Sequence, residues 1–354
     1  MKKYHIIFGI IFLFIFLEGY RLEKKIIKIL LVFSKKNSKD DEGMQKIAIS
    51  IHSVLSKSAE INSRLISINK LLFSAKRAEI IHFIGGPSLK TFILSFLCKK
   101  LNSNVKTILT FTNPIFNKFQ LNFIKFFKPD ICLISSSKWK KVLYENKINY
   151  KFFNVSGVNQ LKFKKINNLK KKKLKIKYKL PLKKKIILHV GHLKKKRNIE
   201  IFKFLNDDDF QVVIVGSTIT KQDHLLIKEL KRKRIIVIDK YLKNIFEIYQ
   251  ISDLYIFPVL DQENAIQIPL SVLEALSCGL PVLSTNFGGL PDIIPSNKFN
   301  ISYSDSIKVD TFFNKNKMLK LIDNKKKNQM KNFSWKIITK NLIKIYKNEI
   351  RKKI

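Results

Sequence analysis

The sequence contains little cysteine. The three cysteines among its 354 residues, Cys98, Cys132 and Cys278, are widely separated and form no C-x-x-C pair. An odd number at such spacing argues against a disulfide scaffold or a zinc knuckle, and a reducing compartment fits best. The motifs H-E-x-x-H and G-x-x-x-x-G-K-[ST] are also absent, which excludes the corresponding metalloproteases and P-loop proteins. No metal site is expected.

Acidic residues are also scarce. The chain has 26 of them against 69 Lys and Arg, for a formal charge of +43. A charge of this size often indicates a nucleic acid or an anionic membrane as a partner. It also fits an A/T-rich coding background, because Lys, Ile, Phe and Asn are abundant while Ala and Gly are rare. The sequence shows no RNP-type motif, zinc finger or helix-turn-helix pattern, so no specific nucleic acid is expected.

Residues 1–22 form an apolar N-terminal segment. The uninterrupted run Ile6–Leu17 would give a helix of only ~18 Å, short of the ~30 Å hydrocarbon core. Three interpretations remain open: a membrane anchor, a cleaved signal peptide, or a buried element of the fold. Arg21, Lys24 and Lys25 follow the run and favour a main body kept in the cytoplasm, at the inner face of the cytoplasmic membrane.

Short apolar runs alternate with helical patterns along the rest of the chain. The alternation stops in a stretch rich in lysine and then starts again, which predicts two α/β units with parallel sheets. The expected strands are Lys25–Ser34, Arg64–Ile68, Glu79–Ile84, Lys106–Phe111, Ile131–Ser135, Lys151–Val155, Ile186–Val190, Gln211–Val215, Ile235–Ile238, Leu254–Phe257 and Pro281–Ser284. The expected helices are Met44–Ser56, Leu89–Leu101, Lys138–Asn146, Ile199–Leu205, Asp223–Leu230, Asn244–Gln250 and Leu270–Leu276.

The lysine-rich stretch marks the domain boundary. Residues 162–185 hold 13 lysines and no acid, so we expect an extended, solvated path there. Trp335, Ile338, Leu342 and Ile345 recur at helical spacing and predict a closing amphipathic helix. The expected units are an N-terminal domain (23–164), a Lys-rich connection (165–184), a C-terminal domain (185–330) and a C-terminal helix (331–354).

The densest chemical signal lies in residues 266–291. Pro269 can begin a helix and Gly279 can end it, with Glu274 near the centre of an otherwise apolar run. A carboxylate in that place can accept paired hydrogen bonds from vicinal hydroxyls such as those of a ribose, although a plain surface Glu would look the same. Gly288 and Gly289 then permit a close approach of the backbone.

The second signal is residues 189–199. A strand, the turn at Gly191, His192, a cationic loop and a helix start follow one another, which suits a diphosphate. Lysine is too common in this chain to be informative. Arg197 is more informative, because arginine is scarce here and binds phosphate through a rigid fork.

These segments together resemble a GT-B glycosyltransferase of family 4, among the glycosyl transferases group 1. The most specific match is Glu274–Val282, which is similar to E-A-M-A-C-G-x-P-V. The others, in family order, are Glu42–Lys46, Val155–Phe163, Gly191–Arg197, Ser252–Pro258 and Phe333–Trp335. The resemblance covers residues 26–350 and implies two facing Rossmann-like domains.

The resemblance also implies a reaction. It is the transfer of a sugar from a nucleotide-sugar donor, with retained configuration and without a metal or other cofactor, to a glycan or lipid-linked acceptor. The pathway would be cell-surface polysaccharide or glycolipid synthesis, and an anionic membrane surface would be a partner. By the match, Glu274 would hold the donor ribose, Arg197 would bind the diphosphate, and Gly43 would let its loop approach the phosphates. No catalytic side chain is identified.

The chain departs from the family pattern at several positions. Ile266 stands where the E-x7-E pattern has its first Glu, and Glu263 lies three residues upstream as a replacement. His192 replaces an arginine. The residues around Thr112 replace a histidine that often follows the fourth strand of the N-terminal domain. A GT-B partner subunit without catalysis is therefore an alternative, and a basic nucleic-acid-binding protein is a further one.

Two more features have ordinary explanations beside functional ones. His82, Gly85 and Gly86 end a strand and could border the acceptor, although a plain turn would look the same. Asp207–Asp209 superficially resembles a D-x-D metal motif, but a polar turn explains it.

Overall fold

The computed structural model describes residues 26–33, 42–113, 118–217, 222–308, 314–324 and 328–352. The apolar segment 1–22 lies outside these residues, so its three interpretations stay open. Within the described ranges, no helix has both the length and the apolar character needed to cross a membrane.

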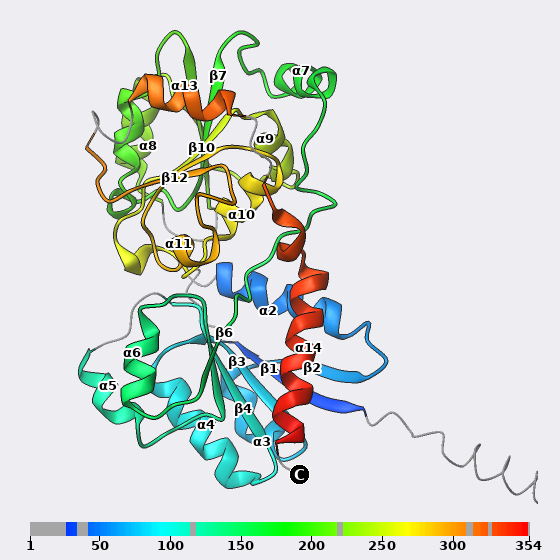
Figure 1. Cartoon of the computed structure of the whole chain (residues 1–354). Coiled ribbons are helices and arrows are strands. Elements are labelled where there is room, and N and C mark those ends of the chain that lie inside the picture. The colour runs from blue at the N-terminus through cyan, green and yellow to red at the C-terminus, as the bar shows by residue number, and fades with distance from the viewer. Residues whose placement is uncertain are drawn as a thin grey trace, which may run out of the picture.

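The N-terminal domain is a parallel six-stranded sheet in the order β2-β1-β3-β4-β5-β6 (Figure 1). The buried strands are runs of Ile, Leu, Val and Phe, as expected of a parallel sheet covered on both faces. The strands are β1 (Ile27–Phe33), β2 (Ile61–Ser67), β3 (Ile80–Gly86), β4 (Lys106–Phe111), β5 (Ile131–Ile134) and β6 (Tyr150–Phe152).

Helices cover both faces of this sheet. One face carries α2 (Glu42–Leu55), whose Ile47, Ala48 and Ile51 are buried. The other face carries α3 (Leu71–Ala75), α4 (Leu89–Leu101), α5 (Lys118–Ile124) and α6 (Trp139–Glu145), packed in one separate apolar cluster. A short 3₁₀ turn, η2 (Ile68–Lys70), precedes α3.

The C-terminal domain repeats this plan with the order β12-β11-β10-β7-β8-β9. Its strands are β7 (Lys185–Gly191), β8 (Phe210–Gly216), β9 (Ile236–Ile238), β10 (Leu254–Phe257), β11 (Val282–Thr285) and β12 (Ile301–Ser304). Its helices are α8 (His224–Arg232), α9 (Ile245–Ile251), α10 (Leu270–Ser277), α11 (Leu290–Ile293) and α13 (Lys315–Asp323), with 3₁₀ segments η3 (Lys195–Arg197), η4 (Ile199–Phe204), η5 (Gln262–Asn264) and η6 (Met330–Phe333). Two parallel α/β domains were the predicted fold class, and that prediction is confirmed.

The Lys-rich connection differs from its prediction. It contains the helix α7 (Asn168–Lys177) instead of an extended path. The helix is capped by the Asn167 side chain, and it packs on α9 of the C-terminal domain. Acidic residues of that domain offset part of its charge: Lys171 and Lys177 pair with Asp253 and Glu247, at 2.7 and 2.6 Å. The prediction failed because it considered only the repulsion between neighbouring lysines, and the sequence does not show that Asp253 and Glu247 lie beside them in the fold.

The segment Ile199–Leu205 also differs from its prediction. It forms the 3₁₀ segment η4 instead of an α-helix. Asn198 precedes it in the left-handed conformation at φ 57°, which separates η4 from η3. The Asn198 amide donates to Pro258 O at 3.0 Å and holds this turn against the strand end at β10.

The closing helix returns to the first domain. α14 (Trp335–Arg351) begins next to the C-terminal domain and runs down the N-terminal domain beside α2 (Figure 1). Leu342, Ile345 and Tyr346 are buried on its inner face. One apolar cluster therefore extends through both domains.

Candidate donor site in the interdomain cleft

A cleft of about 640 Å³ lies between the two domains. The carboxyl ends of β7 and β8 and the start of α10 form its C-terminal wall, while Gly43, Met44, Lys46 and Asn113 line it from the N-terminal domain. Ligands of open parallel sheets bind at the carboxyl ends of the strands, so the cleft is where the topology places a binding site.

Glu274 projects into this cleft from the middle of α10. Its neighbours Leu273 and Ala275 are fully buried, which orients the helix, and the Glu274 side chain is only 7% exposed. The Tyr249 hydroxyl donates to Oε2 at 3.0 Å, and Lys46 Nζ donates to Oε1 at 2.6 Å. Burial and the nearby carboxylate raise the pKa of Tyr249, so its hydroxyl remains a donor. The carboxylate is thus held in one orientation.

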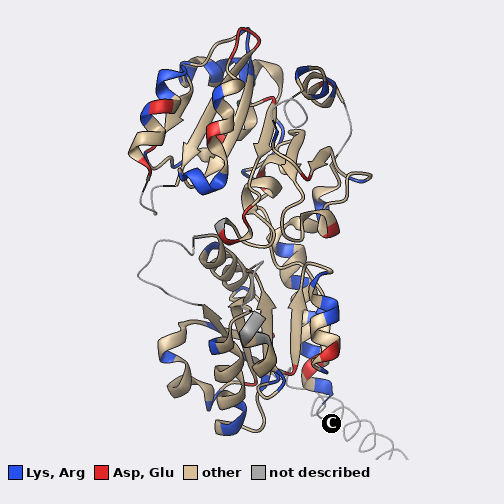
Figure 2. Cartoon of the chain, turned by 90° about the vertical axis from the view of Figure 1, so that its left-hand side faces the viewer, with Lys and Arg blue, Asp and Glu red and all other residues tan. Residues whose placement is uncertain are grey.

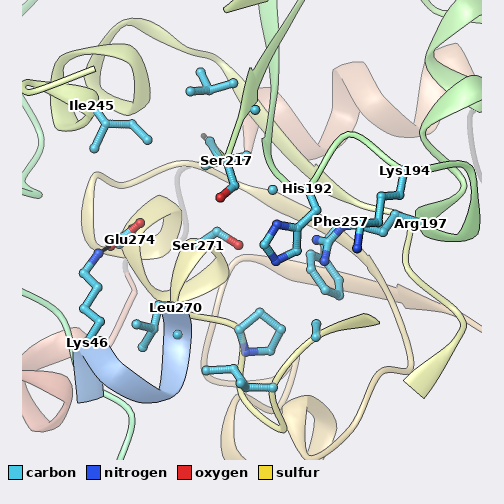
Figure 3. Close-up of a pocket in the computed structure, with 18 of the residues that line it drawn as sticks. Lys46, His192, Lys194, Arg197, Ser217, Ile245, Phe257, Leu270, Ser271 and Glu274 are labelled. Atoms are coloured by element: carbon cyan, nitrogen blue, oxygen red, sulfur yellow. Dashed lines mark hydrogen bonds and ion pairs between the residues drawn. The ribbon is translucent and has the colours of Figure 1, made fainter. Parts of the chain in front are cut away.

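Lys46 reaches Glu274 from the opposite domain. It lies on the first turns of α2, and Figure 3 shows its side chain extended toward α10. The Lys46 side chain is 48% exposed, so the pair is screened by water on one side. The contact joins the two walls of the cleft at the end where Glu274 lies.

Arg197 forms the second charged position. It follows the Gly191 turn on η3 and is 4% exposed, with its guanidinium 5.7 Å from the centre of the Phe257 ring. Burial lowers the pKa of Arg197 to about 10, so it remains a cation at neutral pH. A methyl group at Gly191 would lie 2.6 Å from Arg197 Nη2. Glycine is therefore required for the guanidinium to pack against the end of β7.

A neutral histidine lies next to this cation. Burial, followed by the charge of Arg197, lowers the pKa of His189 to about 3. Its Nδ1 lies 2.9 Å from Ile256 O, so Nδ1 carries the proton and donates. The Nε2 atom of His189 is buried and has no hydrogen-bond partner among the described residues. Because this imidazole is neutral at physiological pH, it adds no second positive charge beside Arg197.

Further polar groups lie between Glu274 and Arg197. Ser271 at the start of α10 and His192 after β7 occupy the centre of the cleft, with Lys194 near Arg197 (Figure 3). The first N–H groups of α10 add the positive end of a helix dipole to this set. Cations and N–H donors lie on one side of Glu274, and this is the arrangement that a nucleoside diphosphate requires.

Residues that follow two further strands of the C-terminal domain also line the cleft. Gly216 and Ser217 follow β8, and residues 240–243 with Ile245 follow β9. The sequence analysis did not identify these residues, nor Lys46 or Tyr249. For residues 240–245, the only signal in the sequence was their position after a predicted strand. Lys46 could not be linked to Glu274 from the sequence, because the two residues are 228 positions apart.

Ile266 lies at the domain junction beside Gly43. A methyl group at Gly43 would come within 3.0 Å of Ile266 Cδ1. The expected close approach at Gly43 is thus made to this side chain in the structure. Glu263 also lines the cleft and is exposed, so its proposed replacement of a carboxylate at 266 remains a prediction.

Gly288 and Gly289 do not line the cleft. The N–H of Gly289 donates to Gln267 O at 3.1 Å, and that of Gly288 to Gln262 Oε1 at 3.2 Å. These glycines support the loop that contains Ile266, because larger residues would collide with the Gln267 and Ser135 carbonyls. In the structure, the close approach of Gly288 and Gly289 is to backbone carbonyls, and their contact with a donor stays a prediction.

His82, Gly85 and Gly86 do not line the cleft either. His82 is fully buried in the sheet, with Nδ1 2.7 Å from the Tyr346 hydroxyl and Nε2 2.6 Å from Thr110 Oγ1. Gly86 O accepts from the N–H groups of Thr112 and Asn113, so the end of β3 is held against the residues that follow β4. Both ring nitrogens of His82 are thus used inside the core, which agrees with the plain-turn alternative, and an acceptor role stays a prediction.

The Asp207–Asp209 turn lies away from the cleft. Asp207 and Asp209 both pair with Lys315 of α13. Among the described residues, no group of three or more His, Cys, Asp or Glu side chains is placed to hold a metal ion.

Comparison with known proteins agrees with this architecture. Residues 170–337 match the model of the family "Glycosyl transferases group 1". The sulfoquinovosyl transferase SQD2 of Arabidopsis thaliana is 28% identical over 119 residues, which are 32% of this chain and 22% of that protein. The N-acetyl-alpha-D-glucosaminyl L-malate synthase of Bacillus anthracis is 27% identical over 132 residues, 34% of this chain and 32% of that protein. The chain thus matches less than a third of the length of either curated relative, and only in part of its own sequence.

A solved structure covers nearly the whole chain. HepE of Anabaena, crystallised with UDP, superposes with a TM-score of 0.72 at 12% identity, covering 91% of this chain and 100% of HepE. At 12% identity, this structural similarity shows the fold alone. The chain therefore has a GT-B fold, and the part of it from 170 to 337 is similar to the glycosyl transferases group 1.

Proposed function

We propose that the protein is a retaining glycosyltransferase that uses a nucleoside-diphosphate sugar. One observation carries the proposal: a buried carboxylate, Glu274, and a buried guanidinium, Arg197, lie along one cleft with the start of α10 between them. Glu274 binds the ribose diol, and Arg197 with Lys194 and His192 binds the diphosphate. The match to group 1 transferases supports this assignment.

The chemistry follows from where charge develops. As the bond between the sugar and the diphosphate breaks, negative charge grows on the leaving phosphate oxygens. Fixed cations and helix N–H groups that are already in place stabilise this charge without reorganising. The charged groups of the chain itself occupy the diphosphate region, so we propose that the reaction needs no metal or cofactor.

We propose that Lys46 pairs first with Glu274 and then, once the donor binds, with the donor phosphates. In the structure it occupies one oxygen of Glu274. A ribose diol that binds Glu274 competes with Lys46 for that oxygen, and the released ammonium group can then pair with the donor phosphates. Gly43 lies on the same wall and provides backbone close to the donor.

The acceptor side is less defined. Asn113 is the described residue that lines the cleft from the end of β4. We propose a glycan or lipid-linked acceptor in cell-surface polysaccharide or glycolipid synthesis, at the inner face of the cytoplasmic membrane. The basic composition and the apolar segment at 6–17 support an anionic membrane as a partner.

A second candidate function is a GT-B partner subunit without catalysis. Ile266 favours it, because an apolar side chain packs at Gly43 where the family pattern has a carboxylate. Such a subunit could still bind a nucleotide, but it would transfer no sugar.

A thermal-shift screen tests the proposal. The purified full chain in mild detergent is screened against nucleoside diphosphates and nucleotide-sugars, with Glu274→Ala and Arg197→Met beside it. Lys195→Ala is the matched control, because Lys195 is exposed on the same turn as Arg197. A ligand at 100 times its Kd adds about 2.7 kcal/mol of stability. Stabilisation of wild type and control but of neither site variant supports the donor site.

Other outcomes separate the alternatives. Absence of any shift in a folded wild-type protein rejects the transferase. A nucleotide shift without release of nucleoside diphosphate from any nucleotide-sugar, with or without acceptors, favours the partner subunit.

A further inference from the structure

Exposed apolar side chains gather on the outer side of α3, α4 and α5. Phe73 is 94% exposed and Phe126 is 61% exposed, which is unusual for phenylalanine on a monomer surface. We define the α3–α5 surface by the exposed residues Leu72, Phe73, Leu97, Leu101, Phe123 and Phe126. These helices are neighbours on one face of the N-terminal sheet, with α4 between α3 and α5.

The topology places much of this surface at one end of the domain. In a parallel sheet, each connecting helix runs back toward the amino ends of the strands. Leu101 ends α4 and Phe126 follows α5, so both lie at the edge where strands begin, away from the cleft. β1 begins at this same edge, and Ile26 just before it is 51% exposed (Figure 1).

Cations lie among the apolar side chains. Figure 2 shows Lys and Arg along the lower part of the N-terminal domain. The exposed cations on or beside the α3–α5 surface are Lys70, Lys76, Arg77, Lys100, Lys125 and Lys128. The acids at this edge already have partners: Asp130 pairs with Lys99 at 3.2 Å, and Glu79 accepts from the N–H of Lys28 at 3.0 Å. The surface is therefore both basic and apolar.

We propose that the α3–α5 surface docks on an anionic lipid bilayer. Basic side chains attract acidic headgroups, while exposed Phe and Leu side chains enter the interface. Two further observations favour lipid over a nucleic acid. The exposed side chains include aliphatic leucines, which offer no ring for stacking on bases, and the chain before Ile26 carries the apolar run at 6–17.

This proposal is independent of the donor site. It assigns a named surface to a lipid partner, and binding to vesicles needs neither nucleotide nor acceptor. The cleft lies at the opposite edge of the sheet, so docking leaves it open. Failure of the donor site would leave this proposal intact, and the reverse is also true.

Tryptophan placed on the surface tests local contact with lipid. Phe73→Trp in the full chain is mixed with vesicles of phosphatidylcholine alone or with phosphatidylglycerol, and the emission is compared with that of wild type. Leu161→Trp is the matched control, because Leu161 is 84% exposed and precedes the lysine-rich α7 in the sequence, outside the α3–α5 surface. A local probe is needed because residues 1–22 could by themselves hold the protein on vesicles.

The expected result is a blue shift at position 73 with anionic vesicles, weakened by salt and smaller with phosphatidylcholine alone. The change Lys76→Glu with Lys100→Glu should reduce this shift, while the emission of the Leu161→Trp protein stays constant. The proposal is overturned if position 73 does not respond, if position 161 responds equally, or if duplex DNA without vesicles produces the same shift at position 73.

Discussion

A single glycine sets the position of the buried cation in the cleft. We predict that Gly191→Ala lowers nucleotide affinity at least about tenfold, equivalent to ~1.4 kcal/mol. The added methyl group would lie 2.6 Å from Arg197 Nη2 and 3.2 Å from His189 Nε2, so the guanidinium must move. Calorimetric titration of the variant with the best nucleotide of the screen checks this. Unchanged affinity in the folded variant would remove Arg197 from the diphosphate site.

A second prediction concerns acid stability. Burial lowers the pKa of His82 to about 3, from an ordinary value of 6.5. Between these values the unfolded chain binds a proton that the folded protein does not. Stability therefore falls as pH drops from 6.5 toward 3, by about 1.4 kcal/mol per pH unit for one histidine. Below pH 3 this contribution is constant.

The variant His82→Gln isolates this effect. It keeps an amide that can bond Thr110 or Tyr346, but it cannot titrate. Urea unfolding at several pH values should give a shallower pH dependence for the variant than for wild type between pH 4 and 6. Parallel curves would contradict a buried, neutral His82.

Among single residues, the sequence identified those that belong to a short local motif. Glu274 and Arg197 both line the cleft as expected. The Lys46–Glu274 pair was missed, because folding alone brings the two residues together. For His82 the sequence left two interpretations open, because a histidine before a glycine turn has the same local pattern whether its ring points into the core or into a cleft.

Among the elements, α7 shows most clearly how a distant partner changes local structure. Asp253 accepts from Lys171 Nζ at 2.7 Å and from the N–H of Ile186 at 2.8 Å, and its side chain is 14% exposed. We predict that Asp253→Ala destabilises the protein by about 1–3 kcal/mol, because two donors lose a buried acceptor. Urea unfolding measures the loss.

A matched control uses an exposed pair. Glu145→Ala removes the partner of Lys141, where the two side chains are 56% and 85% exposed. The cost there should be under about 0.5 kcal/mol. If Asp253→Ala cost no more than Glu145→Ala, α7 would not depend on its acidic partner.

The strands were the most predictable elements. Buried parallel strands such as β3 and β8 are continuous apolar runs, and their positions follow from composition. The short β12 and the helix α3 were not predicted, because four or five residues carry too little periodicity. The 3₁₀ segment η4 resembled an α-helix because its Ile and Phe positions suit either form.

At the scale of the whole molecule, one apolar cluster extends through both domains, and the two edges of the N-terminal sheet differ in what lies beside them. The strand ends of both sheets face the cleft, while the amino edge of the first sheet carries the basic, apolar α3–α5 surface. β1 has seven residues, so about 23 Å of strand separates the two edges. If the α3–α5 surface rests on the bilayer, the cleft lies at the far edge of the sheet. The protein would then act on an acceptor group held away from the lipid surface, such as the end of a lipid-linked glycan.

The sequence predicted this two-domain plan from the restart of the alternation near Ile186. It could not predict which interactions close the cleft. Those interactions include Lys46–Glu274 and the Asp292 carboxylate, which accepts from the Ser137 N–H at 2.8 Å. Both join residues more than 150 positions apart, and no local pattern marks them.

The central claim is that Glu274 reads the ribose of a bound nucleotide, and one calorimetric cycle tests it most directly. The Kd of the best nucleoside diphosphate and of its 2′,3′-dideoxy analogue is measured for wild type and for Glu274→Ala. Wild type should lose about tenfold or more in affinity for the dideoxy analogue, while the variant should bind both ligands equally. Equal affinity of wild type for the two ligands would contradict the assignment of Glu274 to the ribose.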